Sequence, residues 1–229
     1  MTQITATYID HCGSDLSTVN AARVSFGKKS EWEEPFEDCD VSLLRLSKRD
    51  TKLINYLAKH RHISPFGHAF ASFHVKAPIF VARQLVKHSY LRWNEVSRRY
   101  GDDEPEFYTP DVWRGRSEDK KQGSDGVSLW NHGKGTGYRD HEYGVMDDIH
   151  DLYNRMVKVG VAPEQARMVL PQSTMTEWYW SGSLDAFAAM CRLRCKEDTQ
   201  YESRLVADQI STIMQSLYPV SWAALVSNS

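Results

Sequence analysis

Residues 70–90 read FASFHVKAPIFVARQLVKHSY, and this stretch decides the kind of fold to expect. Its first part, Phe70 to Ala77, has the residue pattern of a strand. Pro78 lacks a backbone N–H and has a fixed φ, so it suits the first position of a helix. The stretch therefore predicts a strand that passes directly into a helix running from Ile79 to about Tyr90.

The neighbouring sequence predicts further strands and helices. Ile4, Ala6 and Tyr8 alternate on one face, which is typical of a first strand over 3–10. Capping residues, apolar spacing and terminating Gly or Pro predict helices over Leu16–Val24, from a cap at Asp50 through Ala58, from Met146 to Gly160, after Pro163, from a cap at Ser183 through Leu193, and over Leu205–Leu217. A turn is expected at 181–183, after the aromatic run 178–180. These elements together predict an α+β fold in which helices dominate.

Two polar stretches interrupt this pattern. Residues 27–50 are acidic, and residues 114–140 show no apolar period; seven of the 13 glycines lie between Gly115 and Gly144. Loops of this length are usually functional or disordered. Neither side of them has an obviously complete core, so we expect one domain over 1–229 rather than two.

Composition limits the class of protein. The chain has 229 residues, of which 41% are hydrophobic and 25% charged, close to the average for a soluble globular protein. A net charge of -2 argues against a protein that coats nucleic acid. No long apolar run or signal segment is present in this sequence, so no membrane span is expected. The four sparse cysteines favour a reducing cytoplasm; they are Cys12, Cys39, Cys191 and Cys195.

The densest polar segment is 83–100, RQLVKHSYLRWNEVSRRY. In a continuous helix, Gln84, Lys87 and His88 would share one face because they lie three and four residues apart. Polar and aromatic residues are mixed in the second half, which indicates a lined pocket. The alternative is a helix end with surface charges, and spacing alone does not decide between the two.

Several cations in the sequence suit an anionic ligand. Arg98 and Arg99 present planar forks that match a phosphate, and Ser97 can donate a hydroxyl to it. Arg167 and Arg194 stand among apolar neighbours. Each of these two either points outward from a helix or, if buried, needs an anionic partner.

Other chemistries have weaker support. The histidines at 60, 62, 68 and 74 lack metal-ligand spacing, so no metal site is expected. Cys195 is a weak candidate nucleophile because Arg194 and Lys196 flank it. The sequence contains no G-x-G-x-x-G, phosphate-binding loop or G-x-S-x-G motif, which argues against Rossmann enzymes, P-loop NTPases and α/β-hydrolases.

Residues 87–100 resemble the signature of the flavin-dependent thymidylate synthases, the ThyX family, R-H-R-x-x-S-x-N-E-x-S-x-R-Y. The chain matches its His, Asn, Glu, second Ser, last Arg and Tyr. Further family-like blocks follow the family's order, at 21–26, 64–68, 74–84, 106–108 and 166–171. The resemblance covers about residues 4–220, with stretches near 27–50 and 111–144 that look like insertions.

The resemblance implies a reaction and an assembly. The family makes dTMP from dUMP, with methylenetetrahydrofolate as carbon donor, NADPH as reductant and FAD as hydride carrier. It implies an α+β subunit with a twisted, mostly antiparallel sheet and helices. It also implies a homotetramer with active sites shared between chains, and partners limited to small molecules, without nucleic acid or membrane.

The family's functional positions carry over residue by residue. Arg194 falls at the position of the family's catalytic residue, at the pyrimidine edge. Its fixed charge there would favour the uracil that is deprotonated at N3. The positions that contact dUMP in the family are here Gln84, Lys87, Glu95, Ser97, Arg98, Arg99, Arg167 and Arg194. The positions of the flavin site are here Ser64, Lys87, His88, Ser89, Glu95 and Ser183.

The chain departs from the family mainly in the flavin half. Lys87 and Ser89 replace two signature arginines, and Arg92 replaces a serine. Two later flavin positions hold Asp185 and Ala189. These departures leave two alternatives open: release of 5-hydroxymethyl-dUMP, or a catalytically inactive homologue that only binds a nucleotide.

Overall fold

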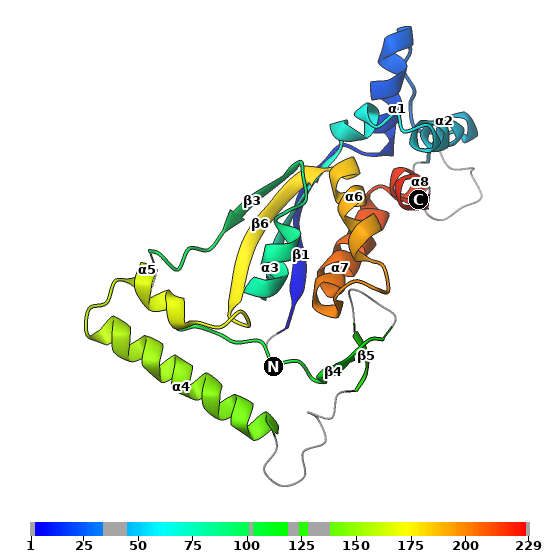
Figure 1. The fold of residues 1–229 in the computed structure, drawn as a ribbon. Helices are drawn as coiled ribbons and strands as arrows, with labels where there is room; N and C mark the ends of the chain where they lie inside the picture. Colours follow the sequence, from blue (N-terminus) through cyan, green and yellow to red (C-terminus); the bar gives the residue numbers. More distant parts are fainter. Residues whose placement is uncertain (1–2, 34–44, 101–102, 119–123, 128–137, 228–229) are drawn as a thin grey trace, which may run out of the picture.

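A four-stranded antiparallel sheet forms the centre of the computed structural model (Figure 1). The structure describes residues 3–33, 45–100, 103–118, 124–127 and 138–227. The strand order is β1-β2-β6-β3. The strands are β1 (Thr5–Cys12), β2 (Phe70–Pro78), β3 (Leu91–Glu95) and β6 (Met175–Ser183). The predicted α+β class is confirmed, and every pairing in this sheet is antiparallel.

The inner face of the sheet carries the hydrophobic core. Strand alternation buries Phe73 and Val75 of β2 beside Trp178 and Trp180 of β6. Phe187 fills the space between sheet and helices, with its ring in a T-shaped contact 5.1 Å from Phe73. Three helices cover this face: α3 (Ile79–Leu85), α6 (Leu184–Arg194) and α7 (Tyr201–Leu217).

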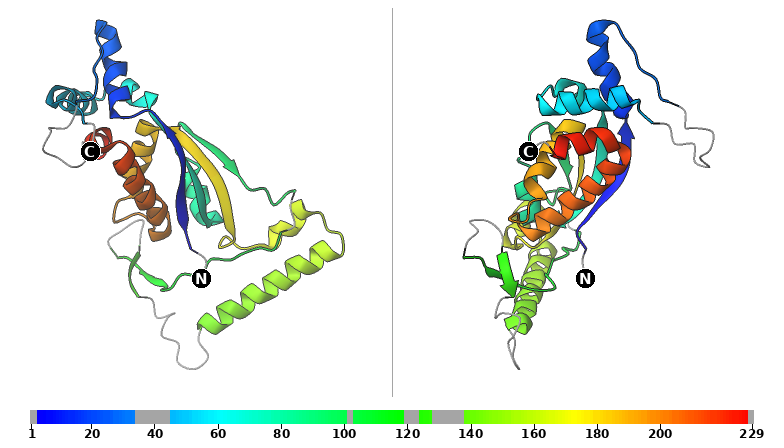
Figure 2. Two further views of the ribbon diagram at one scale, coloured as in Figure 1. Left: turned by 180° about the vertical axis from the view of Figure 1, so that it is seen from behind. Right: turned by 90° about the vertical axis from the view of Figure 1, so that its right-hand side faces the viewer.

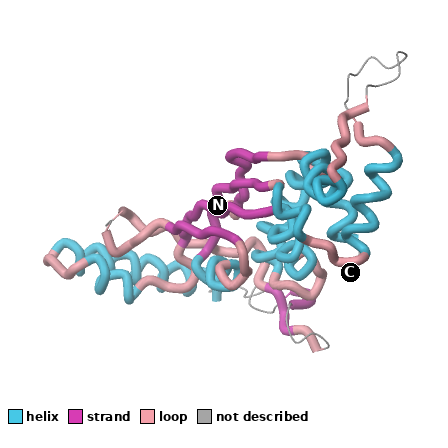
Figure 3. Tube along the Cα trace, turned by 90° about the horizontal axis from the view of Figure 1, so that it is seen from above, coloured by secondary structure: helices cyan, strands magenta, loops and turns pink. Residues whose placement is uncertain are grey.

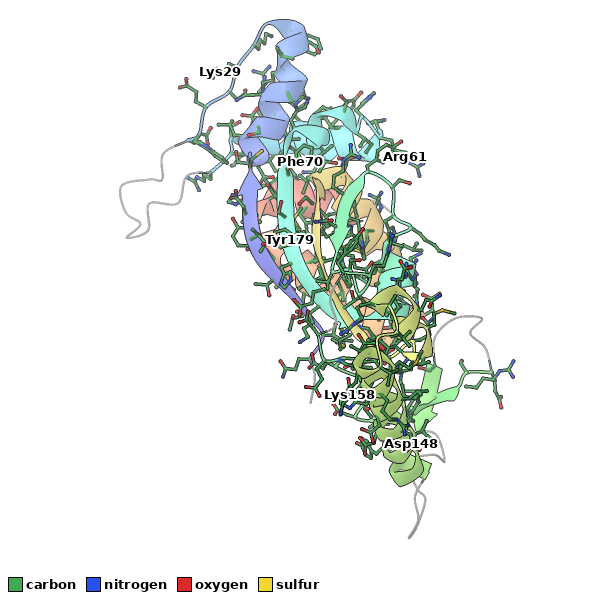
Figure 4. All side chains as sticks on the ribbon, turned by 90° about the vertical axis from the view of Figure 1, so that its left-hand side faces the viewer. Lys29, Arg61, Phe70, Asp148, Lys158 and Tyr179 are labelled. Carbon is green, nitrogen blue, oxygen red and sulfur yellow. The ribbon has the colours of Figure 1, made fainter. Side chains whose placement is uncertain are left out.

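The outer face of the sheet is exposed, and no helix of the described residues covers it, as Figure 4 shows from the side on which Phe70 and Tyr179 are labelled. Lys76 of β2 forms an ion pair there with Glu177 of β6 at 3.7 Å, and His74 Nε2 lies 3.0 Å from the same carboxylate. The two faces therefore differ in chemistry as expected for a half-buried sheet.

One end of the sheet is closed by α1 (Asp15–Arg23), η1 (Val24–Phe26), α2 (Lys48–Lys59), η2 (Ser64–His68) and α8 (Pro219–Ser227). The buried Asp15 carboxylate accepts the backbone N–H groups of Val220 and Ser221 at 2.9 and 2.8 Å, which caps α8. The expected cap of α2 is wrong. Ser47 occupies that position, because its hydroxyl accepts the N–H of Asp50, three residues later.

The opposite end holds β4 (Arg114–Arg116), β5 (Ser124–Val127), α4 (Tyr138–Lys158), α5 (Pro163–Ala166) and η4 (Arg167–Val169). Figures 2 and 3 show the long helix α4 projecting from the body at this end. The expectation of a structureless loop over 114–140 is wrong. Its described part forms a short antiparallel pair, β4 with β5, and α4 begins before the predicted start.

Two element boundaries and one additional helix also differ from the prediction. α3 ends at Leu85 rather than near Tyr90, because the chain turns at 86–90 to enter β3. The expected turn at 181–183 is instead the end of β6, where Gly182 lets β3 approach closely. α8 was not expected, since Pro219 separates it from α7. Within the described ranges, no helix has the length and apolar character needed to cross a bilayer.

Candidate active site

A cavity of about 870 Å³ is lined by residues of α3, the start of α7 and the β4–β5 pair. Its walls combine aromatic and apolar side chains with amides and cations. This mixture suits a flat, polar and anionic ligand. The lining residues are Phe80, Gln84, Lys87, Tyr108, Pro110, Val112, Trp113, Arg114, Ser124, Gln172, Ser173, Arg194, Gln200 and Glu202.

Gln84 is held by two side chains from the start of α7. Its Oε1 accepts a hydrogen bond from Ser203 Oγ at 3.1 Å, and its Nε2 donates to Gln200 Oε1. Gln84 lies on the last turn of α3, so these bonds join α3 to α7. The amide is thus fixed beside the cavity.

Arg194 projects into the same cavity from the last turn of α6. Its Nε donates to His88 Nε2 at 3.0 Å, and its Nη2 lies 3.5 Å from the carbonyl oxygen of Gln84. Burial, followed by the charge of Arg194, lowers the pKa of His88 to about 4. His88 is therefore neutral near pH 7 and accepts the Arg194 N–H.

The expected helix face of Gln84, Lys87 and His88 does not form. Because α3 ends at Leu85, Lys87 and His88 lie in the turn that follows. The turn still brings Lys87 to the cavity wall and His88 to Arg194. The three residues therefore meet at one site by a different route from the one predicted.

The far wall of the cavity contains an ion pair between the buried Glu202 and the partly buried Arg114. Arg114 Nη2 lies 2.6 Å from Glu202 Oε1, and Arg114 Nε donates to Ser124 Oγ at 2.7 Å. Burial, followed by the charge of Glu202, raises the pKa of Tyr108 to about 12. Tyr108 is therefore a hydrogen-bond donor, and its hydroxyl lies 3.5 Å from Glu202. These bonds attach β4 and β5 to α7.

The other predicted nucleotide residues lie elsewhere in the chain. Glu95 ends β3, where it accepts hydrogen bonds from Trp93 at 3.1 Å and Thr176 at 2.9 Å. Ser97, Arg98 and Arg99 follow it in the turn at 97–100, and none of them lines the cavity.

The chain beyond β3 runs toward α5, away from β4 and β5 (Figures 1 and 2). Arg167 is exposed at the start of η4, and its Nε donates to the carbonyl of Glu164. The arginine at 167 thus points outward, while Arg194 is half-buried. Within one chain, the predicted dUMP contacts therefore fall into two groups. The cavity group is Gln84, Lys87 and Arg194, and the group outside the cavity is Glu95, Ser97, Arg98, Arg99 and Arg167.

Comparison with known proteins assigns the family. The family model described as thymidylate synthase complementing protein matches residues 7–220. This chain belongs to the flavin-dependent thymidylate synthases. A flavin-dependent thymidylate synthase of Thermus thermophilus is 36% identical over 216 residues, which cover 94% of this chain and 73% of the relative. That of Kosmotoga olearia is 37% identical over 221 residues, or 95% and 88% of the two chains.

Solved structures agree with this assignment of the chain to the thymidylate synthase family. A UMP/dUMP methylase, PolB from Streptomyces cacaoi bound with 5-Br dUMP, superposes with a TM-score of 0.79 at 32% identity, covering 99% of this chain and 96% of that one. The same enzyme bound with 5-Br UMP gives 0.81 at 30% identity, covering 100% and 96%. The resemblance inferred from the signature is confirmed, and the chain is an enzyme of this class.

Three of the six predicted flavin residues of this chain lie near one end of the sheet. Ser64 begins η2, Ser183 ends β6, and Ser89 is exposed in the turn before β3. Asp185 Oδ1 is buried there without a hydrogen-bond partner in the described structure, 4.0 Å from where a side chain on Gly67 would start. Hydroxyls and an unpaired acceptor suit a ligand rich in hydroxyl and amino groups, as a flavin nucleotide is.

Sequence reasoning missed much of the cavity. Gln200 and Glu202, which line it, and Ser203, which holds Gln84, were not recognised, because the predicted helix began only at Leu205. A charged residue is almost never fully buried without a partner, but the sequence pattern around Glu202 does not show that it is buried. Arg114 was assigned to a loop, and nothing in its local sequence indicates the pairing with Glu202.

Proposed function

We propose that this thymidylate synthase converts dUMP to dTMP, with methylenetetrahydrofolate as the carbon donor and NADPH as the reductant of bound FAD. The observation that carries the proposal is the cavity wall on which Arg194 and Gln84 lie side by side. The solved relatives that hold 5-Br dUMP and 5-Br UMP support a uracil nucleotide as the substrate.

Arg194 supplies the charge for the reaction. Its guanidinium is fixed by His88 and by the Gln84 carbonyl, and desolvation lowers its pKa without removing the proton at pH 7. A fixed cation beside the uracil ring lowers the pKa of N3 and stabilises the deprotonated, electron-rich base. C5 of that base becomes a better nucleophile toward the incoming carbon.

We infer that a second copy of the chain completes the nucleotide site. Gln84, Lys87 and Arg194 surround the cavity, whereas Ser97, Arg98 and Arg99 lie after β3 on another side of the chain. A phosphate bound by the second group and a base bound by the first require two subunits. This division supports active sites that are shared between subunits, and we propose that the assembly is a homotetramer with Arg167 as a further phosphate contact.

The residues that would hold FAD are Ser64, Lys87, His88, Ser89, Glu95 and Ser183. When bound, the flavin supplies the hydride that reduces the transferred carbon. Lys87 offers a charge for a phosphate, and the serines offer hydroxyl donors and acceptors. Glu95 is oriented by Trp93 and Thr176, so its carboxylate has a fixed position at the end of β3.

Product analysis tests the proposal. The full chain is incubated with dUMP, methylenetetrahydrofolate, NADPH and FAD, and the nucleotides are identified by mass. We expect dTMP. Recovery of 5-hydroxymethyl-dUMP would instead support the alternative that the changes at Lys87 and Ser89 favour. Unchanged dUMP with a folded, flavin-loaded protein would support the inactive homologue.

A further inference from the structure

The amide of Gln84 has two ends with different surroundings. Its Oε1 accepts from Ser203 Oγ at 3.1 Å, and Ser203 is fully buried and does not line the cavity. Its Nε2 donates to Gln200, which does line the cavity. The carbonyl end is therefore turned into the protein, and the nitrogen end lies on the cavity side.

The buried hydroxyl of Ser203 keeps the amide in this orientation. Within the described part of the chain, Gln84 Oε1 is the acceptor for this hydroxyl. If the amide turned over, its N–H groups would face Ser203, and this buried hydroxyl would lose the acceptor that it has in the described structure. An unsatisfied buried group of this kind is costly, so the orientation shown is the stable one.

The orientation leaves a donor for a ligand. A primary amide nitrogen has two N–H groups, and in the described structure only one of those on Gln84 is used, by Gln200. Arg194 and Lys87 add N–H groups to the same cavity wall and carry no acceptor. The wall formed by these three residues thus offers donors to the edge of a base.

We propose that Ser203 and Gln200 are positioning residues that select uracil over cytosine by holding Gln84 as a donor. This inference rests on the proposed function. The uracil ring presents carbonyl oxygens at positions 2 and 4, and both accept. Cytosine presents an amino group at position 4, which would place donor against donor and leave both without partners. Sites built around hydrogen bonds discriminate strongly on this basis.

The test compares the affinities of the full-length, FAD-loaded enzyme for dUMP and dCMP by calorimetry. We expect the wild type to prefer dUMP. Ser203→Ala frees the amide to turn, and we expect the preference to fall about tenfold, which corresponds to one buried hydrogen bond. Gln200→Leu removes the partner of the amide nitrogen and is expected to lower the preference in the same direction, so a folding defect in one variant leaves the other as a test.

Controls separate orientation from general damage. Ser203→Thr keeps the hydroxyl, so it should retain the preference. Ser216→Ala removes an exposed hydroxyl of the same helix, whose partner is the Ile213 carbonyl, and should change nothing. Gln84→Glu replaces the donor by an acceptor and should move the preference toward dCMP.

The outcomes distinguish this inference from the proposed function. An unchanged ratio of dUMP to dCMP affinity in folded Ser203→Ala and Gln200→Leu would overturn the positioning role while leaving the function intact. A wild-type enzyme that binds neither nucleotide would overturn the proposed function and this inference together. A ratio that falls in both variants and persists in Ser203→Thr would support it.

Discussion

Arg194 Nε donates a hydrogen bond to His88 Nε2 across 3.0 Å, and this bond joins the last turn of α6 to the turn after α3. An accepting Nε2 requires that the His88 proton be on Nδ1. The two residues come from segments more than a hundred positions apart. The bond therefore ties a predicted flavin position to the predicted catalytic cation.

The first prediction concerns stability and pH. Folding lowers the pKa of His88 from 6.5 to about 4, because burial and Arg194 disfavour its charged form. Between these values the unfolded chain binds more protons than the folded one, so this contribution to stability falls as the pH drops from about 6.5 to about 4. His88→Gln keeps an acceptor and does not titrate, so it should lose less stability between pH 7 and pH 5.

Urea unfolding of both proteins at the two pH values measures this difference. The wild type and His88→Gln share all other titrating groups, so the comparison isolates His88. Equal losses in the two proteins would show that His88 is not held neutral in the folded state.

The second prediction concerns Arg194. Arg194→Ala should lower kcat more than it weakens dUMP binding, because the charge matters most as negative charge develops on the base. We expect kcat to fall by about a hundredfold. Arg83→Ala, which removes an exposed cation from α3, is the matched control and should behave as wild type. An Arg194→Ala enzyme with normal kcat would remove this residue from the mechanism.

The third prediction tests whether sites are shared between subunits. Arg99→Ala alone should weaken dUMP binding by about 2 kcal/mol, since a charge-assisted phosphate contact is lost. Arg99→Ala and Arg194→Ala should each be poorly active as pure proteins. Co-expressed with two different tags and purified through both, they should recover activity, because some sites then combine intact residues from each chain. Mixed oligomers as inactive as the pure variants would place both arginines in one subunit's site.

Local patterns predicted the central elements well. β2, α6 and α7 follow from apolar periodicity and capping residues, because short-range sequence determines them. β3 was missed because it is a short edge strand whose outward-facing residues, Arg92 and Asn94, are polar. Its identity as a strand depends on pairing with β6, which is a long-range contact that no local window contains.

The site was predictable only in part. The family resemblance located Gln84, His88 and Arg194, but the partners of these residues come from distant segments. Ser203 lies 119 positions after Gln84, and Glu202 lies 88 after Arg114. A pattern in one segment cannot reveal which distant side chain it meets, so Gln200, Ser203 and the Arg114–Glu202 pair required the fold.

The fourth prediction concerns the flavin. Ser89 is exposed in the turn before β3 and offers one hydroxyl, where the family signature has an arginine with five N–H donors. We expect the enzyme to purify partly without FAD and to be activated by adding it. Ser89→Arg should tighten FAD by about tenfold, since one charge-assisted bond is gained. Ser216→Arg adds the same charge at an exposed position of α7 and should not change FAD affinity.

Dialysis followed by flavin absorbance measures both expectations. Stoichiometric FAD that survives extensive dialysis of the wild type would contradict weak binding. Strand alternation puts Arg92 on the sheet face opposite Trp93, so we do not expect it to replace the missing arginine. Loss of FAD in Arg92→Ala would show that Arg92 does replace the missing arginine.

The fifth prediction is that no described cysteine is the nucleophile. Cys191 is buried, its thiol donates toward the Ala207 carbonyl at 3.5 Å, and burial raises its pKa, so it is unreactive. Cys195 lines a separate cavity of about 350 Å³ together with Cys191, and neither lines the cavity that holds Arg194. We therefore expect Cys195→Ser to keep most of its activity, as should Cys12→Ser, whose thiol is exposed. Iodoacetamide should label Cys12 and Cys195 and spare Cys191. A folded Cys195→Ser enzyme that binds dUMP but makes no product would restore the covalent mechanism.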